Sequence, residues 1–127
     1  MNTVNDITPY LGTLLNFRHD LHANPELRYE ENRTADKIAA YLQALGLPVH
    51  RGLGKTGVVA TIYGNGRSKD NPGRAIGIRA DMDALPVQET TGAAHASCMP
   101  GKMHACGHDG HTTMLLGAAT LMAKNPA

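Results

Sequence analysis

One short run of the sequence, GKMHACGHDGHTT at residues 101–113, concentrates side chains that can bind a metal ion or act as nucleophiles. Cys106 and His108 are separated only by Gly107, so in an extended or tightly turned backbone a thiolate and an imidazole can converge on one ion. This pair of ligands suits Zn²⁺, Mn²⁺, Co²⁺ or Ni²⁺. The spacing therefore predicts half of a metal site, with Cys106 and His108 as ligands.

Two ligands do not complete such a site, because a catalytic metal normally has three protein ligands and a water molecule. Four nearby side chains are reasonable additions: Asp81, Asp83, His104 and His111. Asp109 directly follows His108 and can accept a hydrogen bond from a ligand histidine, which would fix the tautomer of that ring. We therefore expect the remaining ligands to come partly from outside the run.

Other uses of a cysteine beside histidines stay open. Structural zinc and haem attachment are disfavoured, because paired CxxC spacing is absent and Cys98 lies too far from Cys106. A cysteine–histidine nucleophile pair is an alternative, although near neighbours in sequence seldom reach the geometry of a nucleophile and its base. Cys106 could also be a reactive redox thiol, or the run could have no function.

The composition of the 127 residues is that of one ordinary globular domain, with 42% hydrophobic and 18% charged residues. A net charge of +1, with lysines and arginines scattered, argues against nucleic-acid and membrane-surface partners. The sequence has no signal-peptide pattern and no apolar stretch of membrane-spanning length. We therefore expect a cytoplasmic protein with reduced thiols, in which a cysteine beside histidines is more often a ligand or nucleophile than a disulfide partner.

Apolar residues at helical spacing predict a first helix from about Pro9 to about His22. Thr8 is placed to cap its first N–H groups, and proline is tolerated at the first helical position. His19 and His22 fall near the end of this helix. They are interpreted as surface residues that the helix dipole favours.

Two further helices follow from the same spacing. One begins near the acidic residues 30–31 and Asn32, and Gly46 is placed to end it in the left-handed conformation. The other covers about residues 112–124 and begins near Asp109 to Thr112. It is so apolar that we expect it to lie between a sheet and another layer.

Two strands are predicted between these helices, at residues 58–63 and 74–80, with a polar loop at 65–73. They could pair as a hairpin or belong to a larger sheet. Asp81 and Asp83 follow the second strand, at the edge where open α/β sheets usually bind ligands. Because these elements close a core poorly, we expect the chain to be a fragment of a larger α/β domain.

Four blocks of the sequence, in this order, resemble the N-terminal part of the metal-dependent amidohydrolases of the aminoacylase and carboxypeptidase family. The blocks are RHDLHANPELRYEENRTADKIA, KTGVVA, IRADMDALPVQE and GKMHACGHDGHTTMLLGAA. The nearest subgroup holds hippurate hydrolases, N-acyl-amino-acid amidohydrolases and auxin-conjugate hydrolases. The resemblance implies that residues 1–127 are the N-terminal, incomplete portion of a zinc-exopeptidase-like three-layer αβα catalytic domain. The inserted domain, through which full-length members can form homodimers, and the C-terminal part of the catalytic domain are absent.

The same resemblance assigns roles to individual residues. Cys106 and His108 look like ligands of a site for two divalent ions, Mn²⁺ or Zn²⁺ before Co²⁺ or Ni²⁺. Asp83 looks like the catalytic-site aspartate that orients a metal ligand, and Asp81 stands where many relatives outside the subgroup have a histidine ligand. The substrates implied are small N-acyl amino acids, hippurate-like, cleaved at the amide bond by metal-activated water.

The family pattern also contains parts that this sequence lacks. A glutamate pair that supplies the general base and a further ligand, and two later histidine ligands, are expected beyond residue 127. An alternative is therefore a truncated, catalytically inactive fragment that binds metal or a partner protein. In either case we expect the 127 residues alone to hold metal weakly and to hydrolyse little.

Overall fold

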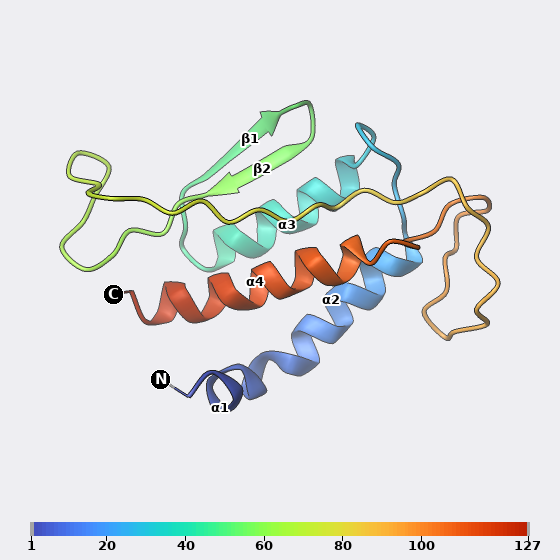
Figure 1. Cartoon of the computed structure of the whole chain (residues 1–127), viewed down its shortest axis with the longest axis horizontal. Helices are drawn as coiled ribbons and strands as arrows, with labels where there is room; N and C mark the ends of the chain where they lie inside the picture. The colour runs from blue at the N-terminus through green and yellow to red at the C-terminus, as the bar shows by residue number, and fades with distance from the viewer. Residues whose placement is uncertain (1, 127) are drawn as a thin grey trace.

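The computed structural model describes residues 2–126, and within them the helices lie on one side of a short β-hairpin (Figure 1). The elements in chain order are α1 (Thr3–Ile7), the 3₁₀ turn η1 (Thr8–Tyr10), α2 (Leu11–Ala23), α3 (Asn32–Ala44), β1 (Val49–Leu53), β2 (Gly57–Ala60) and α4 (His108–Lys124). None of these helices is both long and apolar enough to cross a membrane.

The core lies where α4 meets α2 and α3. Figure 1 shows α4 running beside α2, with α3 and the hairpin on its other side. These three helices contribute one cluster of buried apolar residues: Leu14, Ile38, Leu42, Leu116 and Ala119. A Cβ atom at Gly117 would lie 3.2 Å from a methyl carbon of Leu14, so glycine at this position allows α2 and α4 to approach closely.

The predicted first helix differs from the structure at its start. Thr8 does not cap α2, because Thr8 itself has helical dihedral angles and its hydroxyl donates a hydrogen bond to the Val4 carbonyl. The chain instead enters α2 through α1 and η1. The interpretation of His22 as a surface residue is also wrong, since only 7% of this residue is exposed.

The other two helices agree better with the prediction. α3 spans Asn32–Ala44, and Gly46 has a φ angle of +78°, which confirms the predicted left-handed end. The carboxylate of Glu26 accepts hydrogen bonds from the backbone N–H and the hydroxyl of Thr34, near the start of α3. α4 begins at His108, one residue before the start that was predicted near Asp109 to Thr112.

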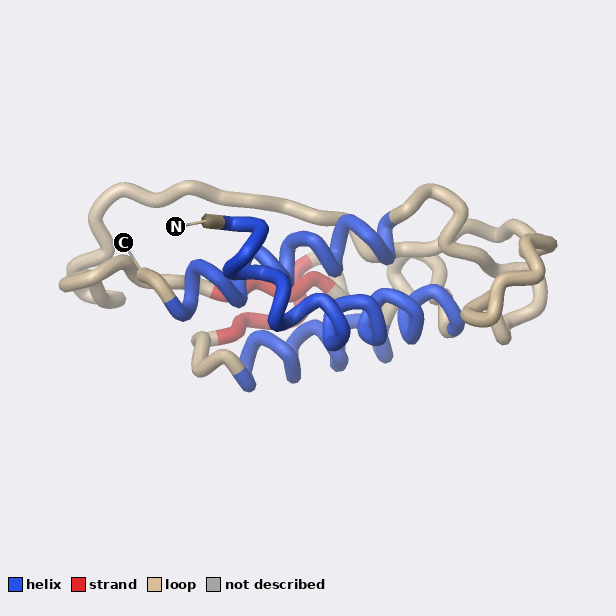
Figure 2. Tube along the Cα trace, turned by 90° about the horizontal axis from the view of Figure 1, so that it is seen from below, coloured by secondary structure: helices blue, strands red, loops and turns tan. Residues whose placement is uncertain are grey.

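The strands differ most from the prediction. β2 covers only Gly57–Ala60, and it pairs antiparallel with β1, which the sequence reading missed. The predicted strand at residues 74–80 is wrong: this segment is extended, but it belongs to no ladder. Figure 2 shows that the chain between β2 and α4 is traced as loop. A strand needs a neighbour for its backbone hydrogen bonds, and among the described residues β2 pairs with β1 while residues 74–80 have no partner strand.

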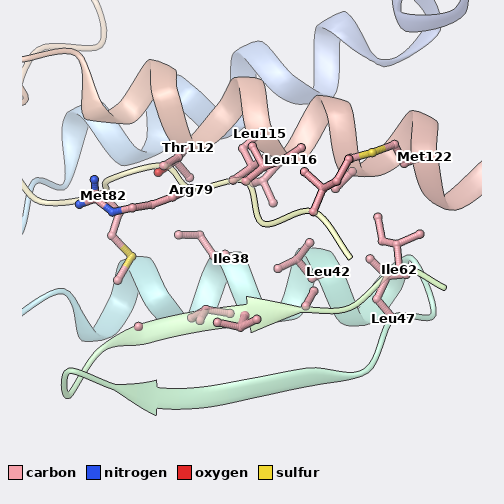
Figure 3. A pocket seen from close by; sticks show the side chains of 18 residues that line it. Ile38, Leu42, Leu47, Ile62, Arg79, Met82, Thr112, Leu115, Leu116 and Met122 are labelled. Atoms are coloured by element: carbon pink, nitrogen blue, oxygen red, sulfur yellow. The ribbon is translucent and has the colours of Figure 1, made fainter. Parts of the chain in front are cut away.

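An apolar groove of about 530 Å³ lies between β2, α3, α4 and the extended segment (Figure 3). Ile38 and Leu42 of α3 face Leu116 of α4 across it. The predicted burial of α4 between a sheet and another layer therefore holds only in part. Ile76, which also lines the groove, is 91% exposed, so its side chain contributes almost nothing to the core.

The packing of α4 predicts which of its residues stabilise the fold. Leu116 is 3% exposed and Met114, two positions earlier in the same helix, is 68% exposed. We expect Leu116→Ala to lower the free energy of unfolding by about 2–5 kcal/mol, because it leaves a cavity in the core. Met114→Ala is the matched control and should change stability by less than about 0.5 kcal/mol. Urea unfolding followed by circular dichroism measures both, and equal losses would contradict this description of the core.

Candidate metal centre

Two carboxylates at residues 81 and 83 face the first turn of α4. The hydroxyl of Thr112 donates a hydrogen bond to the backbone carbonyl of Asp81 (2.8 Å). Close by, Leu85 and Met103 form an antiparallel bridge that joins the two sides of the intervening loop. These contacts bring the end of the extended segment against the beginning of α4.

His108 is held by Asp83. Its Nδ1 lies 2.9 Å from the Asp83 carboxylate oxygen Oδ1 and 2.9 Å from the Asp83 carbonyl oxygen. Both oxygens are acceptors, so Nδ1 carries a proton, and Nε2 is the ring nitrogen that could bind a metal ion. A carboxylate that fixes a histidine in this way is typical of metal ligands.

His111 lies one helical turn after His108 and contacts Asp81. His111 Nδ1 lies 2.9 Å from Asp81 Oδ1, and His108 Nε2 lies 3.7 Å from the same oxygen. The hydrogen bond from His111 is the largest of the influences that hold the pKa of Asp81 below its usual value. Asp81, His108 and His111 each offer a ligand atom, and these atoms lie within 4.8 Å of one another.

Cys106 is not part of this group of three. It is an exposed free thiol, as is Cys98. Among residues 2–126 the structure thus unites His108 with Asp81 and His111, whereas the convergence of Cys106 and His108 on one ion stays a prediction. The spacing of the two histidines, three residues apart on a helix, is the sequence signal that could have singled out His111 as a partner of His108.

Behind this group lies a buried ionic network that the sequence did not reveal. His22 of α2 lies with Nδ1 2.9 Å from Asp109 Oδ2 and with Nε2 2.8 Å from Glu89 Oε1. Asp109 also accepts a hydrogen bond from Arg18, at 3.3 Å. Asp109 was expected to orient a ligand histidine, but in the structure it binds His22 instead.

The charges in this network shift the pKa values of its members. Burial acts to lower the pKa of His22, but its hydrogen bonds to Glu89 and Asp109 outweigh burial and raise it. The pKa of Glu89 is lowered to about 2, mainly because its carboxylate accepts a hydrogen bond from the backbone N–H of Ser97. The hydrogen bond with His22 is the second cause. His104 is buried nearby with neither ring nitrogen hydrogen-bonded, and burial lowers its pKa.

Comparison with known proteins places the metal-ligand run within a recognised region. A family model described as peptidase family M20/M25/M40 matches residues 77–127. The hippurate hydrolase of Campylobacter jejuni is 46% identical over 124 residues, which are 98% of this chain and 31% of that protein. The N-acyl-L-amino acid amidohydrolase of Geobacillus stearothermophilus is 49% identical over 109 residues, which are 85% of this chain and 28% of that protein.

A solved structure agrees with these matches. The YXEP protein of Bacillus subtilis, described as a dinuclear metal binding peptidase from the M20 family, superimposes with a TM-score of 0.85 at 42% identity. The match covers 94% of this chain and 32% of the solved chain. The chain thus spans about 30% of the length of the curated relatives it matches.

The His22 network predicts how stability depends on pH. A neutral imidazole has one N–H, so only the protonated ring can donate to both Glu89 and Asp109. Because the folded-state pKa of His22 is raised above 6.5, its contribution is complete below pH 6.5 and is lost as pH rises through the folded pKa. The contribution of Glu89 to folding stability has the opposite pH dependence. It is present above pH 4.5 and is lost as pH falls toward the folded-state pKa of about 2.

The test compares the wild type with His22→Gln by urea unfolding below and well above pH 6.5. We expect the stability gap between them to be largest below that pH and to shrink as pH rises. The difference in unfolding free energy between the two proteins reports on His22, because both proteins contain its neighbours Arg18, His95 and His104. His50→Gln, an exposed histidine of β1, is the control. A gap independent of pH would show that His22 is not protonated between the two carboxylates.

Proposed function

We propose that this chain, which belongs to peptidase family M20/M25/M40, supplies the first metal-ligand loop of a metal-dependent amidohydrolase. Its fold matches part of a solved M20 peptidase, which agrees with the α/β fold class predicted from the sequence. In this proposal residues 1–127 are a partial catalytic, metal-binding domain. Cys106 and His108 are its metal ligands.

The observation that carries the proposal is the contact between Asp83 and His108. Asp83 holds the proton on Nδ1 and fixes the ring, so that the lone pair of Nε2 is available to an ion. Nitrogen, oxygen and sulfur donors in this combination fit Mn²⁺ or Zn²⁺, and also Co²⁺ or Ni²⁺. The bound ions would polarise the amide carbonyl and activate water. Asp83 therefore acts as a positioning residue for a ligand.

The substrates proposed are N-acyl amino acids of the hippurate type. Support comes from the relatives, of which one is named a hippurate hydrolase and another an N-acyl-L-amino acid amidohydrolase. A metal-binding thiolate at Cys106 must stay reduced, and both cysteines are free, so we place the protein in the cytoplasm. A homodimer formed through an inserted domain is proposed only for the full-length form.

A second candidate is a catalytically inactive fragment that binds metal or a partner protein. The open apolar groove favours it, because an exposed apolar surface of this kind is typical of a site that another polypeptide covers. The composition of the donor group also favours it: among residues 2–126 the group contains no glutamate that could act as a general base.

The Asp83 contact can be tested through metal affinity. We expect Asp83→Asn to weaken Co²⁺ binding about 10–100-fold, because the amide orients His108 less well than the carboxylate and lowers its basicity. Asp70→Asn, an exposed aspartate in the loop after β2, is the matched control and should bind Co²⁺ like the wild type. Isothermal titration calorimetry measures both. Unchanged affinity in Asp83→Asn would remove the role proposed for Asp83.

The two candidate functions differ in turnover. We expect the purified 127-residue chain to hydrolyse N-benzoylglycine barely above background, with Mn²⁺ or Zn²⁺ added, because its donor group lacks a general base. Release of benzoate and glycine, followed by chromatography, measures the rate, and a chelator-treated sample is the control. Fast metal-dependent turnover would establish that these residues suffice for catalysis and would exclude the inactive fragment.

A further inference from the structure

We infer that Asp81 and His111 are metal ligands as well, and that with His108 they bind one divalent cation through three protein donors. The inference rests on the proposed function, because it adds ligands to the ion held by His108. Nothing in the relatives' names or in the family match assigns a role to either residue. The candidate ligands lie at the end of the extended segment and in the first turn of α4 (Figure 1).

Two of the distances between the donor atoms match those of a coordination sphere. With metal–ligand bonds of about 2.1 Å, two donors lie about 3.0 Å apart at a right angle and about 3.4 Å apart at the tetrahedral angle. Asp81 Oδ1 lies 2.9 Å from His111 Nδ1 and 3.7 Å from His108 Nε2, and the donor atoms of the three residues lie within 4.8 Å of one another. One ion can therefore contact all three residues with little movement of their side chains.

The orientation of the His108 ring directs a donor atom into the group. Asp83 accepts a hydrogen bond from Nδ1, so Nε2 is the ring nitrogen that lies toward the carboxylate of Asp81, 3.7 Å away. His111 reaches the same Asp81 oxygen from the other side. The three residues together offer one carboxylate and two ring nitrogens, a donor set that suits a divalent cation such as Mn²⁺, Zn²⁺ or Co²⁺.

Binding the cation requires only a change of tautomer at His111. The proton that Nδ1 donates to Asp81 moves to Nε2 of the same ring, and the imidazole stays neutral while Nδ1 turns its lone pair to the ion. The side chain of His111 is 47% exposed, so its Nε2 can reach water and the ion can enter from solvent.

The surroundings hold the donors in place and balance the charge. His108 and His111 share one face of α4, with ring centroids 5.4 Å apart, and Thr112 holds the backbone of Asp81. The carboxylates of Asp81 and Asp83 offset the positive end of the α4 dipole. The one competing cation at this position is Arg79, 3.6 Å from Asp81 in the described chain, and its side chain is 84% exposed and free to move away.

The test is a Co²⁺ titration of the whole 127-residue chain and its variants, followed by calorimetry and by the visible ligand-field spectrum. We expect Asp81→Asn and His111→Gln each to raise the dissociation constant about ten-fold or more and to change the ligand-field bands, because each removes a donor. Asp70→Asn and His50→Gln, both exposed, are the matched controls and should behave as the wild type. Circular dichroism verifies folding, and because His111 is half exposed its variant remains informative if Asp81→Asn unfolds.

Cys106→Ser and His108→Gln separate the inference from the proposed function. The thiolate-to-cobalt charge-transfer band reports Cys106, while the ligand-field bands report the whole donor set. If His108→Gln and Cys106→Ser abolish binding but Asp81→Asn and His111→Gln keep wild-type affinity and spectrum, the inference is overturned and the proposed function stands. If the charge-transfer band is absent but Asp81 and His111 are required, the inference stands and the role of Cys106 fails. Binding that survives His108→Gln overturns both.

Discussion

The contact on which the site depends most is the bridge that His22 makes between Asp109 and Glu89. It joins α2 to the first turn of α4 and to the loop before it, three segments that are far apart in the sequence. All three side chains are almost completely buried, so each charge needs the others for compensation. Because Asp109 directly follows His108, the same bridge fixes the turn of α4 that carries His108, the proposed ligand.

The candidate metal ligands stand out in the sequence more clearly than the residues that surround them in the fold. A cysteine and three histidines within one short run are rare enough that residue type and spacing pointed to Cys106 and His108. Residue type and spacing alone could not predict the hydrogen bond between Asp83 and His108, because the two residues are 25 positions apart and only the fold brings them together. The burial of His22 was hidden for the same reason, since local sequence at the end of a helix indicates solvent exposure.

Among the secondary-structure elements, helices were predicted well and strands poorly. The apolar stripe of α3 and the glycine after it are local signals, and the structure follows them. Strands depend on partners elsewhere in the chain, and local pattern did not reveal β1, the strand that pairs with β2. The alternating isoleucines of residues 74–80 have the pattern of a half-buried strand, but their backbone forms no ladder and Ile76 is almost fully exposed. Such a segment is available to any strand that can lie in the apolar groove beside it.

Gly107 limits how the metal-ligand loop can vary in evolution. Its φ of +86° and ψ of +14° lie in the left-handed region, at the residue that directly precedes α4. Most other residues would strain the backbone there by about 1–2 kcal/mol, although an added Cβ would only come into ordinary contact with His111 Nε2, at 3.9 Å. The spacing of Cys106 and His108 is thus set by a backbone turn rather than by an ion. Mutation can therefore exchange the donor atoms on either side and so change which metal is preferred, while the glycine between them has to stay.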